Sequence, residues 1–207
     1  MMSPSLEHTP PEVMIGLAIH DPAWRDLNIE TDLENFVESL SRSAFLSADY
    51  TWLPKQAETI DISIVLTNDD EIKGINAEYR GKDKPTNVLS FPQITPDENL
   101  EGVDIPAYMP LGDIILARET IVREASEQGK DLDAHIAHMV VHGTLHLLGY
   151  DHMNDSDARI MEGLESDILK TFGFKAPYDD DYNAANGTST PADGDAGTTG
   201  HTDRGDT

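Results

Sequence analysis

The chain is 207 residues long and 38% of its residues are hydrophobic, which is enough for one domain with a proper core. Its formal net charge of −25 argues against non-specific binding to nucleic acid or anionic membranes, because attraction to phosphate needs lysine and arginine. Cysteine is absent, so any zinc site must rely on histidine and oxygen ligands.

The amino-terminal region has no pattern typical of export. Residues 1–12 are polar, contain three prolines and lack a basic segment followed by an apolar core, so we interpret them as a flexible N-terminus and not as a secretory signal. The apolar run at 13–19 is too short to span a bilayer and predicts a first strand. We therefore expect a cytoplasmic protein without membrane contact.

Strand and helix patterns follow in alternation. A helix is predicted at 31–47, because apolar residues recur there at helical spacing and Thr31 can cap it, with Glu34 three residues later. The same kinds of pattern predict strands at 60–66, 87–91 and 111–117, a helix at 71–78 started by Asn68 and Asp69, and a helix at 119–127. No glycine-rich phosphate loop follows any of these strands.

Two features stand between the helix at 71–78 and the strand at 111–117. Arg80, Lys82 and Lys84 form a dense basic cluster in an otherwise acidic chain and lead directly into the strand at 87–91. The loop after that strand has nearly twenty residues and four prolines, longer than compact domains usually tolerate without a purpose. It is either a lid that contacts substrate or a variable surface excursion, and we weigh these equally.

A helix at about 133–148, capped by Asp131 or Asp133, carries the main candidate site. His142 and His146 lie one turn apart on the same face, about 6 Å along the axis, so both rings can reach one cation. Gly149 can end the helix in a left-handed conformation and let the chain return so that His152 joins them. Three imidazoles with an open fourth position are typical of a catalytic zinc site.

Two other histidines share the helix face with this pair. His138, His142 and His146 together span roughly 12 Å, which is too far for three bonds of about 2.0–2.1 Å to one zinc ion. We therefore interpret His135 and His138 as exposed side chains or as residues behind the ligands, without a ligand role. The opposite face is aliphatic and predicts a core contact, through Ile136, Ala137, Val140, Val141, Leu147 and Leu148.

The last predicted helix is capped by the segment 154–157 and runs to Phe172, with Gly173 as its stop. Beyond Pro177 the chain has almost no large aliphatic residues and carries seven aspartates against one arginine, which predicts a disordered acidic tail at 177–207. The folded part is thus expected at 13–176. We predict one α/β (α+β) domain with a mixed sheet of about four strands packed against helices, the histidine helix lying beside the sheet.

The motifs resemble two families to different degrees. The spacing His-x-x-x-His-x-x-Gly-x-x-His is that of metzincin peptidases, but Gly143 stands where those enzymes carry the glutamate that acts as general base. The full string His-Gly-Thr-Leu-His-Leu-Leu-Gly-Tyr-Asp-His at 142–152 instead resembles the signature of the YbeY family. The blocks at 79–92 and 111–114 are also similar to this family, in the same order, so the resemblance covers roughly residues 60–174.

The resemblance implies a zinc-dependent endoribonuclease, specific for single strands, that acts on ribosomal RNA. Its implied roles are maturation of the 3′ end of the small-subunit RNA and ribosome quality control, with the ribosomal small subunit as partner. One zinc ion per chain would lie on His142, His146 and His152, although nickel or copper would fit nearly as well. A metal-stabilised, ribosome-associated factor with weak or no nuclease activity remains the alternative, and a zinc peptidase is less favoured because of Gly143.

Arg80 is the predicted catalytic residue, because a planar and permanently charged guanidinium suits phosphate, and the resemblance gives it that role. Lys82 and Lys84 are predicted to bind substrate with it. Asp113 and Asp151 are candidates for a general base, but we favour a role in which each orients a ligating imidazole.

Overall fold

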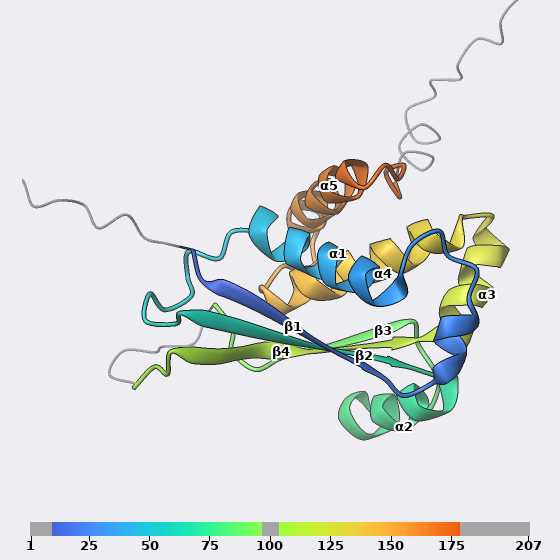
Figure 1. The fold of residues 1–207 in the computed structure, drawn as a ribbon, viewed down its shortest axis with the longest axis horizontal. Helices are drawn as coiled ribbons and strands as arrows, with labels where there is room; N and C mark the ends of the chain where they lie inside the picture. Colours follow the sequence, from blue (N-terminus) through green and yellow to red (C-terminus); the bar gives the residue numbers. More distant parts are fainter. Residues whose placement is uncertain (1–9, 97–103, 179–207) are drawn as a thin grey trace, which may run out of the picture. The chain divides into compact units, whose positions relative to one another are not determined.

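The computed structural model describes residues 10–96 and 104–178, and the predicted flexible N-terminus and acidic tail lie mostly outside them. Figure 1 shows the fold. The elements in chain order are β1 (Glu12–Ile19), a short 3-10 helix η1 (Pro22–Asp26), α1 (Leu33–Ser47), β2 (Thr59–Thr67), α2 (Asp69–Arg80), β3 (Val88–Pro92), β4 (Tyr108–Ala117), α3 (Arg118–Gln128), α4 (Leu132–Leu147) and α5 (Asp155–Thr171).

The sheet has the strand order β1-β2-β4-β3. β2 pairs in parallel with both β1 and β4, whereas β3 pairs antiparallel with β4 and forms one edge. β4 begins at Tyr108, three residues before the predicted start, because Pro110 is tolerated where the register with β2 shifts between Asp61 and Ile62. The predicted α/β domain with a mixed four-stranded sheet is confirmed.

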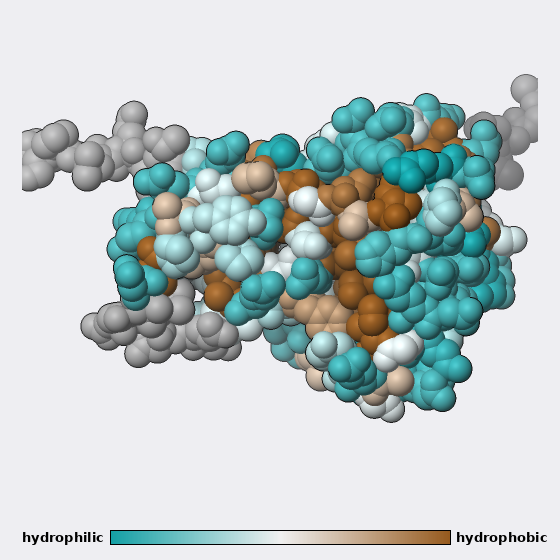
Figure 2. Space-filling model, turned by 60° about the horizontal axis from the view of Figure 1, so that its bottom comes forward, coloured by the Kyte–Doolittle hydropathy of each residue, from teal (hydrophilic) through white to brown (hydrophobic). Residues whose placement is uncertain are grey.

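The two faces of the sheet are covered differently. Helices α1, α4 and α5 lie on one face and α2 lies on the other (Figure 1). On the three-helix face, α4 buries the predicted aliphatic positions, with Ile136 and Val140 fully excluded from solvent. On the α2 face, Ile75, Phe91 and Ile115 are only partly buried around a small core cluster, and Figure 2 shows a band of apolar surface there between polar regions.

Side-chain caps fix where several helices start. Asn68 caps α2 as predicted, and its side-chain oxygen accepts a hydrogen bond of 2.9 Å from the Glu71 amide. Helix α1 is capped by Asp32, which accepts from the Asn35 amide at 3.0 Å, so the prediction of Thr31 as the cap is wrong by one residue. Such caps satisfy amides that have no partner within the helix.

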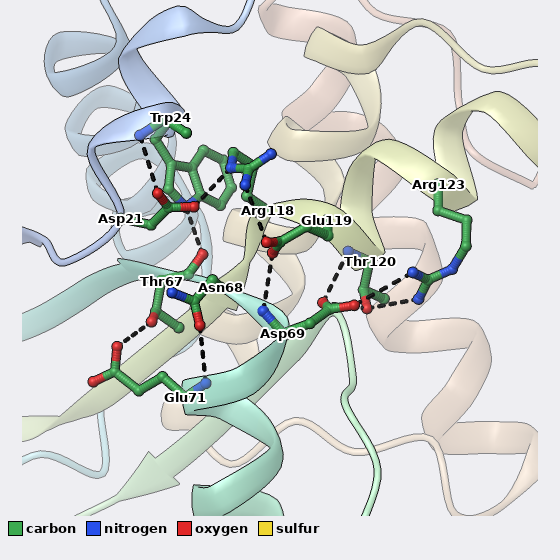
Figure 3. A network of polar contacts seen from close by, with 11 residues as sticks. Asp21, Trp24, Thr67, Asn68, Asp69, Glu71, Arg118, Glu119, Thr120 and Arg123 are labelled. Carbon is green, nitrogen blue, oxygen red and sulfur yellow. Dashed lines mark hydrogen bonds and ion pairs between the residues drawn. The ribbon is translucent and has the colours of Figure 1, made fainter.

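A polar network ties together the carboxyl ends of the parallel strands (Figure 3). Arg118 pairs with Asp21 at 2.7 Å, while Asp69 accepts from the Thr120 hydroxyl at 2.6 Å and donates its own amide to Glu119 at 2.9 Å. In open α/β sheets this end of the strands is the usual ligand site. Here it is occupied by the protein's own contacts between η1, α2 and α3.

Among the described residues, no helix is long and apolar enough to cross a membrane.

Candidate metal centre

The structure brings the three predicted ligands together. His142 and His146 lie one turn apart on α4, and Gly149, with φ of 88°, reverses the chain so that His152 returns to them. One nitrogen from each of the three rings lies within 4.8 Å of the other two. The ring centroid of His152 is 5.5 Å from that of His142 and 5.2 Å from that of His146.

Hydrogen bonds on the far side of two rings fix which nitrogen faces the cluster. The Nδ1 of His146 lies 2.9 Å from the carbonyl oxygen of Tyr150, and a carbonyl only accepts, so Nδ1 carries the proton and Nε2 keeps its lone pair. The Nδ1 of His142 lies 2.8 Å from Oε1 of Glu165. The two Nε2 atoms are 3.0 Å apart, close to the separation of about 3.3 Å that two zinc bonds at the tetrahedral angle require. A divalent cation therefore fits this donor set.

The electrostatics of the cluster keep its central histidine neutral. Burial first, and then the neighbouring His142 and His152 rings, lower the pKa of His146 to about 4. A metal ligand must be the neutral imidazole, because the lone pair binds the ion. His146 is thus ready to bind a metal throughout the neutral pH range.

A buried glutamate behind the cluster was missed by the sequence reasoning. Glu165 on α5 is fully excluded from solvent, and its Oε2 lies 3.1 Å from Nε2 of His138. His138, His142 and Glu165 form a second group whose ligand atoms lie within 4.8 Å of one another. The signal was present in the sequence, because Glu165 is four residues after Met161 and three before Ile168, on the apolar stripe of α5.

His135 does not belong to either group. The expectation that it could be exposed is wrong, because only 4% of its surface is accessible. Its Nε2 lies 2.9 Å from a carboxylate oxygen of Glu124 on α3, so the ring packs between two helices, and burial lowers the pKa of the imidazole. The helical wheel placed it on the histidine face but could not show that α3 covers that end of α4.

A cleft of about 650 Å³ joins the histidines to the basic cluster. Its walls come from the end of α2, from the edge strand β3 and from the segment that runs from α4 to Met153 (Arg80, Lys82, Thr86, Asn87, Val88, Ser90, Pro92, His142, His146, Gly149, Tyr150, Asp151, His152 and Met153). Lys84 is not among these residues, and its backbone carbonyl accepts a hydrogen bond of 2.7 Å from the Asn76 side chain. Two of the three predicted cations therefore line the cleft.

Arg80 is held at the cleft by weak contacts. Its guanidinium lies 3.4 Å from the Ser90 carbonyl oxygen and 6.0 Å from the centre of the Phe91 ring. No ion pair joins it to an acidic side chain within the described part of the chain, and the nearby Asp83 instead pairs with Lys73 at 3.4 Å. The positive charge of Arg80 is thus available to an anion in the cleft.

The two predicted aspartates have different positions. Asp151 lines the cleft, and its carboxylate accepts a hydrogen bond of 2.7 Å from the amide of the adjacent His152. Asp113 precedes Ile114, which faces α4, so its side chain projects to the opposite face of the sheet, where it accepts from Gln93 at 3.4 Å. The structure brings Asp151, and not Asp113, to the histidines.

Two glycines set the shape of the site. A Cβ added at Gly143 would lie 2.8 Å from the Ile114 side chain, so this position packs against the sheet and has no room for the glutamate of a peptidase. A Cβ added at Gly149 would lie 2.5 Å from Pro96, which shows that the start of the long loop covers the turn before His152. Residues 97–103 of that loop lie outside the described residues, so its interpretation as a lid stays a prediction.

The chain is similar in sequence to one protein family and to named members of it. The family model described as Endoribonuclease YbeY matches residues 25–173. A protein named endoribonuclease YbeY from Rhizobium etli is 46% identical over 169 residues, covering 81% of this chain and 94% of that one. One from Rhizorhabdus wittichii is 45% identical over 168 residues, covering 80% and 97%. A solution structure from Thermotoga maritima aligns with a TM-score of 0.47 and 22% identity, over 86% of this chain and 97% of that one. The chain therefore belongs to the YbeY family of endoribonucleases, which are hydrolases.

Proposed function

We propose that this protein is a zinc-dependent endoribonuclease that cleaves single-stranded RNA in the cytoplasm. We further propose that it acts in the maturation of the 3′ end of small-subunit ribosomal RNA and in ribosome quality control, on the small ribosomal subunit. The observation that carries the proposal is that three convergent imidazoles and the guanidinium of Arg80, which has no ion pair within the described residues, line one cleft.

His142, His146 and His152 would hold the metal through their ring nitrogens. A zinc ion bound there supplies a Lewis acid that activates water near neutral pH. Nickel or copper would fit nearly as well, since imidazole binds all three ions. The Asp151 carboxylate accepts a hydrogen bond from the His152 amide and so stabilises the loop that carries the third ligand. The chain's contribution is to keep the rings fixed and one side of the cluster open to the cleft.

Arg80 would neutralise the charge that builds on the non-bridging oxygens of the cleaved phosphodiester. Its planar fork can donate two parallel hydrogen bonds to phosphate, and among the described residues no carboxylate forms an ion pair with it. Lys82 lines the same cleft and adds a second positive charge for the RNA backbone. This local reversal of charge gives a chain of net charge −25 a surface on which RNA can bind.

The test is cleavage of defined RNA by the purified full chain. We expect cutting of a single-stranded oligonucleotide, little cutting of the same sequence in a duplex, loss of activity with a chelator and recovery with zinc. His146→Ala should lose both the metal, by elemental analysis, and the activity. The proposal fails if the zinc-loaded protein leaves single-stranded RNA intact, or if His146→Ala keeps a full equivalent of metal.

The net charge favours one alternative, a ribosome-associated factor in which the metal mainly stabilises the fold. Such a factor would bind small ribosomal subunits and lose thermal stability without metal, but it would not turn over RNA. Measuring subunit binding and cleavage on the same preparation separates the two functions. A zinc peptidase is disfavoured, because Gly143 offers no general base and packs against the sheet.

A further inference from the structure

We propose that Glu165 and His138 are positioning residues that determine which nitrogen of His142 faces the metal. The inference rests on the proposed function, because it takes His142, His146 and His152 as the metal ligands. It concerns a chain of three side chains, His138–Glu165–His142, that links the core between α4 and α5 to the cleft.

The two candidate metal groups cannot be used together. They share His142, which points Nδ1 at Glu165 and Nε2 at His146, with distances of 2.8 Å and 3.0 Å. A neutral imidazole has one lone pair, so it binds a metal through one nitrogen and donates a proton from the other. A metal on the His138/His142/Glu165 group would therefore remove His142 from the group of His142, His146 and His152, here called the triad.

The contacts of the neighbouring residues decide between the two groups. The Tyr150 carbonyl already directs the lone pair of His146 toward the triad, and the cleft opens on that side. Glu165 as a carboxylate accepts only, so the proton of His142 lies on Nδ1 and its lone pair also faces the triad. Each ring thus has an acceptor behind it, the arrangement that orients metal-binding histidines.

His138 has the complementary role. Glu165 is fully buried, and a buried carboxylate is stable only when its oxygens are paired. Oε2 lies 3.1 Å from His138 Nε2 while Oε1 lies 2.8 Å from His142, so the two imidazoles hold the carboxylate from both sides. His138 thereby fixes the direction of Oε1, although it is one turn too far along α4 to join the triad.

The experiment compares Glu165→Gln, Glu165→Leu and the matched control Glu124→Gln. Glu124 makes the same kind of contact with a histidine of α4, at 2.9 Å from His135, but that ring is outside the triad. Three quantities are measured for each full-length variant: the zinc affinity by competition with a chromophoric chelator, the thermal stability without metal, and, by nitrogen NMR of the zinc-bound protein at neutral pH, which nitrogen of His142 carries the proton.

In the wild type we expect the His142 proton on Nδ1. Glu165→Leu should shift it and weaken zinc binding by about 100-fold, while Glu165→Gln, which keeps an acceptor oxygen, should weaken it by about 10-fold. Glu124→Gln should leave the zinc affinity and the position of the His142 proton unchanged, even if it changes the thermal stability. His138→Gln should weaken zinc binding less than either Glu165 variant and keep one metal site.

Equal zinc affinity and an unchanged tautomer in folded Glu165→Leu would overturn the inference. The inference would also be wrong if His138→Gln lost zinc binding while His152→Ala kept it. The metal would then lie in the buried group of His138, His142 and Glu165. If Glu165→Leu does not fold, the zinc affinity of Glu165→Gln and the position of the His142 proton in the wild type still test the inference. These results are separate from the proposed function, which fails instead if wild-type protein binds no zinc or cuts no RNA.

Discussion

At the residue scale, Arg80 is predicted to act in the reaction and not in the fold. Arg80→Ala should reduce kcat/KM for RNA by about 100-fold or more, as loss of one preorganised donor does, with metal content and Tm unchanged. Arg80→Lys should recover only part of the activity, because an ammonium cannot replace the fork. Lys84→Ala is the matched control, since Lys84 does not line the cleft, and it should cleave at nearly the wild-type rate. Arg80→Ala with full activity would remove this residue from the mechanism.

The buried histidines give the metal-free protein a predicted pH dependence. The folded-state pKa of His146 is about 4 and that of His135 is also lowered, against about 6.5 in an unfolded chain. Below pH 6.5 the unfolded state binds protons that the folded state does not, so stability is full above this pH and is lost as pH falls toward 4. Denaturant unfolding of the metal-free protein at several pH values measures this slope.

His146→Gln is the variant that isolates the contribution of one histidine. It should flatten the fall in stability between pH 6.5 and 4, because glutamine does not titrate. His20→Gln is the control, since His20 is half exposed, pairs with Glu71 and follows β1, the edge strand opposite β3. An equal slope in wild type and His146→Gln would show that the imidazole is not buried as described.

At the element scale, the contact between α4 and the sheet depends on Gly143. Gly143→Ala places a Cβ against Ile114 and Ser90, and such overpacking typically costs 1–3 kcal/mol, reduced by about 1 kcal/mol of better helix propensity. We expect a net loss of about 0–2 kcal/mol, measured by chemical denaturation. Gly163→Ala on α5, where the added Cβ meets nothing within 4 Å, should instead stabilise by up to about 1 kcal/mol.

The element boundaries were predictable where a local signal ends each one. Gly129 and Gly173 take left-handed conformations after α3 and α5, as their positions in the sequence indicated. The start of β4 was not predictable, because Tyr108 to Pro110 join the sheet only through pairing with β2. Propensity favours a loop around Pro110, and a tertiary contact overrides it.

At the scale of the whole molecule, residues 179–207 are predicted to add negative charge and no stability. Removing residues 179–207 takes away seven aspartates and one arginine, so the net charge changes from −25 to −19. Because the segment has almost no large aliphatic residues, Tm and metal content should stay nearly unchanged. Differential scanning calorimetry and elemental analysis check this, and a fall of many degrees would show that the segment packs on the domain.

The features that depend on local geometry follow from the order of the amino acids alone. The i, i+4 spacing of His142 and His146 requires a helix with both rings on one face, and Gly149 lets His152 return, so the triad could be predicted without the fold. The alternation of strands and helices likewise indicated one α/β domain. Both inferences use periods of a few residues.

Which distant residues share the site depends on how the strands and helices pack. Arg80 reaches the cleft because β3 folds back as the edge strand beside β4 and carries the end of α2 to the histidines. Glu165 reaches His142 because α5 packs on α4. Asp113 does not reach the site, because side chains alternate along β4 and its own projects to the other face of the sheet. Chain periodicity sets which face a side chain occupies, but the order of strands and helices in space sets what that face meets.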